Sequence, residues 1–419
     1  MRCLVEASWG MGDVLQATPL CHALWLLGFD VDLLVSLPWL APLLDGLPPI
    51  QRVLTDRAAV DFGGYDFAVS AFGDRHALAR VAPGLCRDVT FRDVFSGGLL
   101  EANLRPARDL GYDGPVPPSL ARAAAPPRDL RPRAVVVHAG CDPRARGKRW
   151  SGWPEICDRL AAAGHHVIVV GTEVDRSDTG WERRHDCRFG LALPELVALL
   201  AGAELYLGND SGVGHLAAAA GTPGVLAFGP TDPEIYAPNS AALRRLAAPA
   251  HDGETRAPVV GRRVPIDRLD VETVWREVEA VARDRRRDPL RPLPARRPAP
   301  RGDLEARLPS PAEIRAVPPT LQATDALLAR VFTAGVLGLV ARGGDRRWRR
   351  EVAIAAGHAN LRAAEARRVD RTWRSHRKAL RNLYLAWRAG LHVPSLAAGL
   401  ALVATRRSRG AHWDDRTLD

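Results

Sequence analysis

The alternation of short apolar strands with helices constrains the fold of this chain more than any other feature. Residues 2–7 predict a buried strand that leads into the loop Gly10–Gly12, and Val31–Ser36 predicts the next strand. The pattern restarts at Ala134 and continues to a strand at Val225–Phe228. Strands connected through helices run parallel and are covered on both faces, so each run predicts a doubly wound α/β domain. Because ligands bind beyond the carboxyl ends of such strands, we expect functional residues in the loops there.

Residue types at the helix ends predict where two of the helices begin. Thr18-Pro19 is typical of an N-cap followed by proline at the first helical position, so the first helix is expected to begin there and to end at Gly28. Asp270 is expected to cap a later helix with an apolar stripe at helical spacing. That stripe consists of Val271, Val274, Trp275, Val278 and Val281.

Composition divides the chain into four parts. Residues 1–130 and 131–285 predict two successive Rossmann-like domains. Residues 286–321 contain nine prolines and many arginines, which predicts an extended linker, and residues 322–419 predict a helical basic extension. From residue 286 onward there are 27 Lys and Arg against 12 Asp and Glu, a balance of +15 within a total of +10. The basicity therefore belongs to the C-terminal part and not to the two domains.

Features that the sequence lacks indicate a cytoplasmic protein and exclude several classes. The six cysteines form no C-x-x-C pair, which disfavours a zinc ribbon and suits reduced thiols. The N-terminus does not have the pattern of a signal peptide, and we expect no transmembrane helix. There is no P-loop, H-E-x-x-H or G-x-S-x-G motif.

Lysine is rare in this chain, which makes Lys148 conspicuous. Lys148 and Lys378 are the only lysines among 58 basic residues. Lys148 lies in the loop that follows the predicted strand Val135–Val137. A lysine and backbone N–H groups in such a loop would suit an anionic ligand. The alternative is a solvated basic loop without a ligand.

The segment 208–223, GNDSGVGHLAAAAGTP, predicts a second anion-binding loop. A helix is expected to begin near Gly212, where free N–H groups and the positive end of the helix dipole would hold a phosphate. Asp210 would accept hydrogen bonds from sugar hydroxyls, and Ser211 would donate its hydroxyl. The alternative for both residues is helix capping alone. His215 lies one turn into the helix, and its alternative is a buried, hydrogen-bonded core histidine.

Carboxylates near the first two predicted strands admit chemical and structural interpretations. Asp13 follows Gly10 and Gly12, which let a ligand approach the backbone, and its carboxylate would act as a general base. The alternative is that Asp13 stabilises the start of its helix. Asp30 and Asp32 have the spacing of a metal–diphosphate site, but they lie at the start of a predicted strand, which favours a structural role.

Four blocks of this sequence resemble the bacterial heptosyltransferases of glycosyltransferase family 9. Their order and spacing agree with that family, and the resemblance covers residues 1 to about 285. It implies a GT-B fold, in which an N-terminal acceptor domain and a C-terminal donor domain face each other across a cleft. The blocks are GDVLQATPL from Gly12, KRW from Lys148, GNDSGVGHLAA from Gly208 and FGPTDP from Phe228.

The resemblance also implies a reaction and the residues that perform it. The reaction is an inverting transfer of heptose from ADP-heptose to the inner core of lipopolysaccharide, without a metal or another cofactor. Asp13 matches the base, Lys148 the lysine on the donor phosphates, and Asp210 the aspartate on the heptose hydroxyls. Glu173, after the predicted strand that ends at Gly171, matches a glutamate on the nucleotide ribose. Ser211 and Gly212 match the diphosphate loop. The candidate site further includes His215 on the donor side and the glycine loop of Gly10 and Gly12.

The sequence departs from the family mainly where the acceptor is concerned. The N-terminal domain is short, and the tail of about 130 residues is additional. The family often has Ser or Thr before the lysine, where this chain has Asp142-Pro-Arg-Ala-Arg. Three alternatives stay open. They are a nucleotide-sugar epimerase or hydrolase on the same fold, a glycosyltransferase with a non-lipopolysaccharide acceptor, and a non-catalytic surface or assembly protein.

The basic tail has three interpretations. Residues 342–381 mix arginines with Trp348 and Trp373, which predicts peripheral contact with an anionic membrane at its inner face. The second interpretation is a helical bundle that packs on the catalytic body and turns its arginines to solvent. Nucleic acid is the third, and it is not expected as a partner because no known binding module is present.

Overall fold

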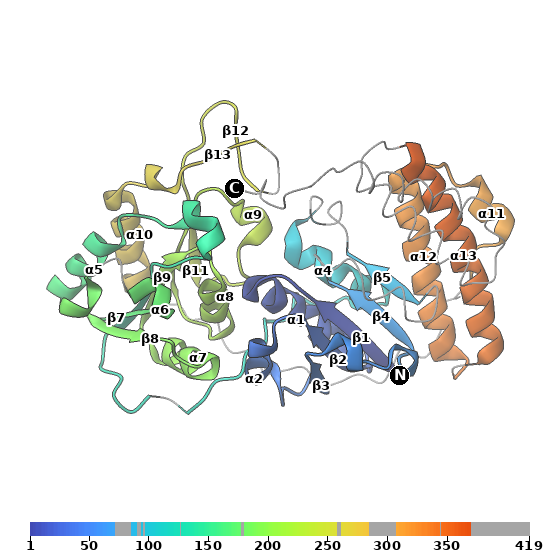
Figure 1. Ribbon diagram of the computed structural model, residues 1–419, viewed down its shortest axis with the longest axis horizontal. Coiled ribbons are helices and arrows are strands. Elements are labelled where there is room, and N and C mark those ends of the chain that lie inside the picture. The colour runs from blue at the N-terminus through green and yellow to red at the C-terminus, as the bar shows by residue number, and fades with distance from the viewer. Residues whose placement is uncertain are drawn as a thin grey trace, which may run out of the picture.

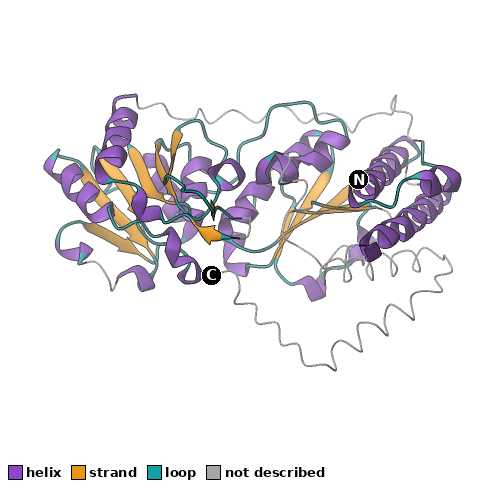
Figure 2. Cartoon of the chain, turned by 90° about the horizontal axis from the view of Figure 1, so that it is seen from above, coloured by secondary structure: helices purple, strands orange, loops and turns teal. Residues whose placement is uncertain are grey.

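Two parallel sheets, each covered by helices, form the body of the molecule, and a pair of long helices lies at one end (Figure 1, Figure 2). The computed structural model describes residues 1–71, 85–89, 94, 97–125, 127–176, 180–257, 261–284, 307–343 and 345–369. All strand pairings of the two large sheets are parallel. The α/β class predicted from the strand and helix alternation is therefore confirmed.

The N-terminal sheet has the strand order β3-β2-β1-β4-β5. Its elements are β1 (Arg2–Ala7), α1 (Met11–Leu26), β2 (Asp30–Val35), α2 (Ala41–Leu44), β3 (Arg52–Leu54), β4 (Phe67–Ser70), β5 (Cys86–Asp88) and α4 (Gly98–Asp109). β1 and β2 pair in register up to Ala7 with Val35, so their carboxyl ends lie level. The strand order reverses between β1 and β4, and such a switch point opens a crevice at the carboxyl ends of the strands.

The second sheet has the strand order β11-β10-β9-β6-β7-β8. Its strands are β6 (Ala134–His138), β7 (His166–Gly171), β8 (Asp186–Phe189), β9 (Leu205–Asn209), β10 (Gly224–Phe228) and β11 (Leu243–Ala247). Its helices are α5 (Trp153–Ala162), α6 (Glu173–Arg176), α7 (Leu193–Gly202), α8 (Gly212–Ala219), α9 (Pro233–Tyr236) and α10 (Val271–Asp284). A separate strand pair joins β12 (Glu254–Thr255) to β13 (Arg262–Arg263). Here the order reverses between β6 and β9. The loops that follow these two strands therefore meet at the second switch point.

Helix α10 forms where the sequence predicts it. The carboxylate of Asp270 accepts a hydrogen bond from the backbone N–H of Thr273 at 2.7 Å, which satisfies a free donor of the first turn. Val274, Val278 and Val281 are buried in the core of the second domain. The predicted cap and the predicted apolar stripe are both confirmed.

The first helix begins earlier than Thr18-Pro19 predicts. α1 begins at Met11 and continues through Pro19 to Leu26. Proline has no N–H to donate to the carbonyl of Leu15, four residues earlier, but the hydroxyl of Thr18 donates to that oxygen at 2.7 Å. The expectation was wrong because a neighbouring side chain replaces the hydrogen bond that proline removes.

The last helices of the described chain share the core of the first domain. α12 (Leu321–Ala341) and α13 (Arg346–Val369) lie side by side beyond β4 and β5 (Figure 1). The ring of Phe332 on α12 meets that of Phe67 on β4 edge to face, with centroids 5.9 Å apart. Arg349 of α13 forms an ion pair with Asp66. The chain thus returns from the second domain to complete the first one.

The predicted extended linker at residues 286–321 contains a helix. Residues 307–321 are described, and α11 spans Pro311–Ala316 within them. The hydroxyl of Ser310 accepts from the N–H of Glu313 at 3.2 Å, and the Glu313 carboxylate accepts from the N–H of Ser310 at 2.7 Å. This capping box overrides the proline and arginine composition, so that part of the prediction was wrong. Residues 286–306 and 370–419 lie outside the described residues.

Helix α12 is long and apolar enough to cross a membrane, which the sequence analysis did not expect. It has 21 residues and a mean hydropathy of 1.5 over its best window, of which 56% is buried inside the protein. Packing accounts for much of this apolar surface. Gly335 lies against Val352 and Leu85, and Gly338 lies against the ring of Trp348.

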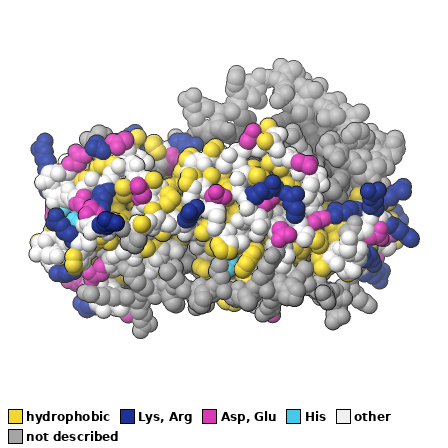
Figure 3. Space-filling model, turned by 90° about the horizontal axis from the view of Figure 1, so that it is seen from below, with side chains coloured by type: hydrophobic (Ala, Val, Ile, Leu, Met, Phe, Trp, Pro, Cys, Tyr) yellow, Lys and Arg dark blue, Asp and Glu magenta, His cyan; other side chains and the backbone are white. Residues whose placement is uncertain are grey.

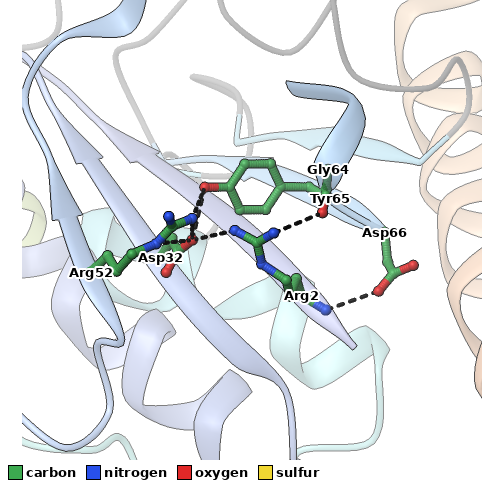
Figure 4. Close-up of polar contacts among 6 residues, drawn as sticks. All are labelled: Arg2, Asp32, Arg52, Gly64, Tyr65 and Asp66. Atoms are coloured by element: carbon green, nitrogen blue, oxygen red, sulfur yellow. Dashed lines mark hydrogen bonds and ion pairs between the residues drawn. The ribbon is translucent and has the colours of Figure 1, made fainter. Parts of the chain in front are cut away.

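A polar cluster fixes the amino-terminal half of the first sheet (Figure 4). The buried carboxylate of Asp32 accepts hydrogen bonds from Arg52 at 2.6 Å, Tyr65 at 2.8 Å and Arg2 at 3.2 Å. Burial alone would raise the pKa of Asp32, but these three donors outweigh it and hold the pKa below its usual value. Asp30 lies 3.9 Å from the N-terminal amine. The structural interpretation of Asp30 and Asp32 is therefore the better one.

The packing of α12 on the first sheet predicts that Phe332→Ala destabilises the protein. The substitution removes a buried ring from the core, and we expect a loss of about 3–5 kcal/mol in the free energy of unfolding. Urea unfolding followed by circular dichroism measures this loss. Ile354→Ala on α13, where the side chain is 37% exposed, is the control, with an expected loss below about 1 kcal/mol. Equal losses in the two variants would show that α12 does not belong to the core.

Candidate functional site

Loops at the two switch points carry most of the residues that the sequence singled out. Lys148 is the last residue of the 3-10 helix η5 (Pro143–Lys148), in the loop after β6. Asp210 and Ser211 directly follow β9, and Asp13 lies in the first turn of α1, after β1. Helices α1 and α8 contact each other across the domain boundary (Figure 1). The structure therefore brings these loops together at one place.

Lys148 and Asp210 form an ion pair at the centre of the site. The Nζ of Lys148 lies 2.7 Å from Oδ2 of Asp210, and the Asp210 side chain is only 6% exposed. The hydroxyl of Thr231, after β10, donates to the same oxygen at 2.6 Å. Burial would raise the pKa of Asp210, but the Lys148 charge and the hydrogen bonds from Lys148 and Thr231 outweigh it and lower the pKa. Asp210 is thus an anion that holds Lys148 in place.

Ser211 contacts a histidine and does not cap its helix. It occupies the N-cap position of α8, yet its side chain makes no capping hydrogen bond. Its Oγ lies 3.0 Å from Nδ1 of His138, the last residue of β6. Burial lowers the pKa of His138 to about 4, so the imidazole is neutral at pH 7. The capping interpretation of Ser211 is therefore wrong, because its hydroxyl contacts His138 and not a backbone N–H group of α8.

His215 of α8 lies against the glycine loop of the other domain. A Cβ atom on Gly12 would lie 2.9 Å from Cδ2 and 3.0 Å from Nε2 of His215, so a larger residue at position 12 would displace the imidazole. Burial lowers the pKa of His215 to about 4. Its Nδ1 has no hydrogen-bond partner within the described part of the chain. This differs from the expected alternative of a core histidine with its hydrogen bonds satisfied.

Glycine also allows the starts of α1 and α8 to touch. A Cβ atom on Gly212 would lie 2.5 Å from Cε of Met11, closer than side chains approach each other. Gly10 precedes α1 as its N-cap, and a Cβ there would lie 3.3 Å from the Asp13 carboxylate. The small residues that the sequence assigned to ligand approach therefore serve the contact between the domains as well.

Asp13 has both properties that the sequence left open. Its Oδ2 accepts a hydrogen bond from the backbone N–H of Gly10 at 3.0 Å, so it does stabilise the start of α1. Burial raises the pKa of Asp13, and the Gly10 hydrogen bond and the Lys148 charge only partly offset this effect. A carboxylate with a raised pKa in a cleft is a better proton acceptor than an exposed one. Capping and base catalysis are therefore compatible at this residue.

Asn209 ties the two halves of the site together, and the sequence analysis did not assign it a role. The residue is fully buried at the end of β9. Its Oδ1 accepts from Nε1 of Trp153 at 2.7 Å, and its Nδ2 donates to the carbonyls of Ala139 at 2.9 Å and Gly140 at 3.2 Å. These bonds fix the loop that carries Lys148 to the strand that precedes Asp210. Its position beside Asp210 in the GNDSG motif was the only signal for it.

A cavity of about 290 Å³ lies at the carboxyl ends of β6, β7 and β8. Four of its lining residues are aromatic, namely Trp150, Trp153, Trp181 and Phe189. Asp175 also lines it and is paired with Arg149 at 3.0 Å. An apolar cavity with a few polar groups is the usual form of a small-molecule site.

Glu173 lies near this cavity but is not one of its lining residues. It is the first residue of α6, the short helix that also contains Asp175. Its carboxylate is exposed and pairs with Arg176 at 2.8 Å. The structure therefore places Glu173 at the correct edge of the sheet without a contact to the Lys148 and Asp210 pair.

Together these groups suit a ligand with a diphosphate and a leaving group. Lys148 supplies a cation, the start of α8 supplies backbone N–H groups, and Asp13 supplies a carboxylate with a raised pKa from the opposite domain. Within the described residues no group of three or more His, Cys, Asp or Glu could hold a metal ion.

Comparison with known proteins shows which family this site is similar to. Residues 117–256 match the family model "Glycosyltransferase family 9 (heptosyltransferase)". These residues make up about a third of the chain. They include Lys148, Asp210 and His215, so the resemblance based on the sequence blocks is confirmed. A curated relative, lipopolysaccharide heptosyltransferase 3 of Escherichia coli, is 31% identical over 163 residues. That match covers 34% of this chain and spans about half, 47%, of the relative.

Solved structures show that a similarity in fold extends over the whole two-domain body. E. coli ADP-heptose lipopolysaccharide heptosyltransferase II has a TM-score of 0.53 at 18% identity, over 68% of this chain and 99% of that one. E. coli heptosyltransferase WaaC with ADP has a TM-score of 0.52 at 20% identity, over 67% and 100%. A family 9 glycosyltransferase from Veillonella parvula has a TM-score of 0.53 at 14% identity, over 68% and 97%. At these identities the likeness shows the fold, which is the two-domain α/β arrangement predicted from the sequence.

The buried bonds of Asn209 predict a large stability loss in Asn209→Ala. The substitution leaves an indole N–H and two backbone carbonyls unpaired, and we expect the free energy of unfolding to fall by about 2–4 kcal/mol. Thermal unfolding without ligand measures the change. The control is Asn239→Ala, which removes a single partly buried hydrogen bond to Pro117 and should cost about 1 kcal/mol. A loss no larger than that of the control would refute the role of Asn209 as a tie between the loops.

Proposed function

We propose that this protein is an inverting glycosyltransferase that moves a heptose from ADP-heptose to an acceptor resembling the core of lipopolysaccharide. The observation that carries the proposal is the Lys148 and Asp210 pair at the start of α8, with Asp13 opposite it on the other domain. The family 9 match supports glycosyl transfer as the reaction class. The choice of donor follows the names of the related proteins, which include heptosyltransferase WaaC with ADP.

The proposed donor spans from the aromatic cavity to the start of α8. Its adenine would occupy the cavity, whose four aromatic side chains suit a flat base. Glu173, near that cavity, would bind the ribose once it exchanges Arg176 for the ligand. Lys148 and the N–H groups of Ser211 and Gly212 would hold the diphosphate, and His215 would contribute a neutral imidazole beside them. Asp210 would then accept hydrogen bonds from heptose hydroxyls.

The proposed reaction is a single displacement. The carboxylate of Asp13 takes the proton from an acceptor hydroxyl, and the oxygen attacks the anomeric carbon from the face opposite the diphosphate. As the new carbon–oxygen bond forms, the bond to the diphosphate oxygen breaks and ADP leaves. Lys148 and the start of α8 stabilise the negative charge on the departing diphosphate. No metal and no further cofactor takes part in this scheme.

A nucleotide-sugar epimerase or hydrolase on the same fold is the alternative. It would convert the donor without an acceptor, whereas the transferase needs both substrates. Turnover of ADP-heptose alone at the rate seen with acceptor would therefore favour the alternative. A glycosyltransferase with a non-lipopolysaccharide acceptor would leave the donor site unchanged and would differ only in the acceptor that it uses.

The function also bears on where the protein acts. We propose that it works in the cytoplasm, at the inner face of the membrane, because a lipid-linked acceptor would lie there. Exposed arginines surround the turn between α12 and α13, and basic side chains gather at that end of the molecule (Figure 3). They are Arg342, Arg346, Arg347 and Arg350. Basic residues of this kind attract anionic lipid headgroups by about 1 kcal/mol each.

The assignment of the base predicts that Asp13→Asn abolishes transfer but keeps donor binding. An asparagine can still accept the hydrogen bond from Gly10, but it takes up no proton, so we expect kcat to fall at least about 1,000-fold. Because the pKa of Asp13 is raised, the wild-type rate should fall with decreasing pH at values above those of an exposed aspartate. ADP-heptose should still raise the melting temperature of Asp13→Asn.

Lys148→Ala is the matched variant in this experiment, because it should lose the ADP-heptose stabilisation that Asp13→Asn retains. Product release is followed as ADP, and binding as the thermal shift. Substantial activity in Asp13→Asn would eliminate the proposed base. An unchanged thermal shift in Lys148→Ala would eliminate the proposed phosphate site.

The arginine cluster predicts binding to anionic vesicles that salt weakens. The protein should sediment with vesicles containing phosphatidylglycerol at low ionic strength, and less so at about 0.5 M salt because of screening. Vesicles of phosphatidylcholine alone are the control. Arg346→Gln combined with Arg347→Gln should reduce the bound fraction severalfold. Equal sedimentation with both vesicle types would contradict an electrostatic membrane contact.

A further inference from the structure

An exposed tryptophan with a strained backbone lies a few residues before the proposed base in the chain. Trp9 follows β1 and precedes Gly10, in the loop that leads to Asp13. Its side chain is 53% exposed, and its backbone has a φ of 82°. A bulky side chain with positive φ costs about 1–3 kcal/mol, and such strain gathers at functional sites. A glycine would avoid this cost, so the structure keeps an indole where the backbone disfavours one.

A second exposed tryptophan follows a strand that ends at the same edge of the sheet. Trp39 is also 53% exposed and lies in the 3-10 helix η1 (Pro38–Leu40), after β2. β1 and β2 are neighbours and end level at Ala7 and Val35, so both indoles follow the carboxyl ends of adjacent strands. The α2 helix that comes directly after η1 contacts α7 of the second domain. This edge of the first sheet therefore faces the proposed donor domain.

The exposure of these two indoles contrasts with that of other tryptophans in the described chain. Trp150, Trp153, Trp181 and Trp348 are all at most 5% exposed. A sugar ring presents a face of C–H groups that packs on an aromatic ring, while its hydroxyls remain free for hydrogen bonds. Two indoles at the edge next to the base would therefore suit a saccharide and would orient its hydroxyl towards Asp13.

We propose that Trp9 and Trp39 form the stacking platform for the saccharide of the acceptor. This inference rests on the proposed function, since it assigns the acceptor side of the same site. Trp9 is the nearer of the two to Asp13 along the chain and sets the position of the attacking hydroxyl. Trp39 extends the platform to the neighbouring strand and binds a more distant part of the saccharide.

Steady-state kinetics with a lipid-free inner-core oligosaccharide of lipopolysaccharide tests the platform. Trp9→Ala and Trp9→Gly should each raise the acceptor KM at least about tenfold, with the KM for ADP-heptose unchanged. Trp9→Phe should retain most of the acceptor affinity because it keeps an aromatic ring. Trp9→Gly also relieves the backbone strain, so it should melt at or above the wild-type temperature while it loses acceptor binding. If Trp9 had only a structural role, these substitutions would change the melting temperature and the KM values of both substrates.

Binding is measured independently of turnover by ¹⁹F NMR of the full chain labelled with 5-fluorotryptophan. Trp9→Phe and Trp39→Phe assign the two resonances, and both should shift when the oligosaccharide is added. The resonances of buried tryptophans should not shift. Ile354→Ala, an exposed apolar residue on α13, is the kinetic control and should leave the acceptor KM unchanged.

The outcomes separate this inference from the proposed function. An active wild-type enzyme whose acceptor KM is unchanged in Trp9→Gly would overturn the platform and leave the transferase assignment intact. Absence of both ADP-heptose stabilisation and transfer in the wild type would overturn the proposed function. Even if the proposed function fails, the platform predicts that the oligosaccharide shifts the Trp9 and Trp39 resonances. Resonances that do not shift would therefore overturn the platform as well.

Discussion

The buried ion pair between Lys148 and Asp210 is the interaction on which the candidate site depends. It joins the loops after β6 and β9, the two strands between which the order of the second sheet reverses. An ion pair of this kind adds little net stability, because removing two charges from water offsets their attraction. Its presence in a chain with only two lysines therefore fits the proposed donor site. When the donor binds, its diphosphate would replace Asp210 as the partner of Lys148, and sugar hydroxyls would donate hydrogen bonds to Asp210.

The same place on the molecule is where the two domains touch. Gly12 lies against His215, and Gly212 lies against Met11, so the starts of α1 and α8 approach within side-chain contact. The main chain of α9 adds a further link, since its Tyr236 carbonyl accepts a hydrogen bond from Gln16 of α1 at 2.9 Å. The proposed base on one domain and the proposed phosphate site on the other must be aligned for the reaction. Close packing of the helix starts supplies that alignment.

The C-terminal helices show that domain order and chain order differ in this protein. α12 and α13 follow the second domain in sequence, yet Phe332, Val336 and Trp348 belong to the core of the first. α12 is as apolar as a membrane span because much of its surface is buried in this core. The same packing places the exposed arginines at the turn between α12 and α13 near the end of the molecule that carries the proposed acceptor domain. An acceptor at an anionic surface would then be close to the first sheet.

The sequence by itself determined the alternation of strands and helices, the α/β class, the α10 cap at Asp270, and the blocks that resemble family 9. These are local features, because capping, periodicity and motif spacing depend on neighbouring residues. It also singled out Lys148, Asp210 and Asp13, since rare or charged residues after strands stand out. The start of α1 was misplaced, because the hydroxyl of Thr18 restores the hydrogen bond that Pro19 removes.

Only the tertiary structure decided the rest. Asn209 became important through bonds to Trp153, Ala139 and Gly140, which are about 55–70 residues away in the chain. The use of Ser211 by His138, the contact of Gly12 with His215 and the return of α12 to the first sheet likewise join distant segments. Such contacts depend on which strands become neighbours, and that order is set by the packing of the whole sheet, not by local residue pattern.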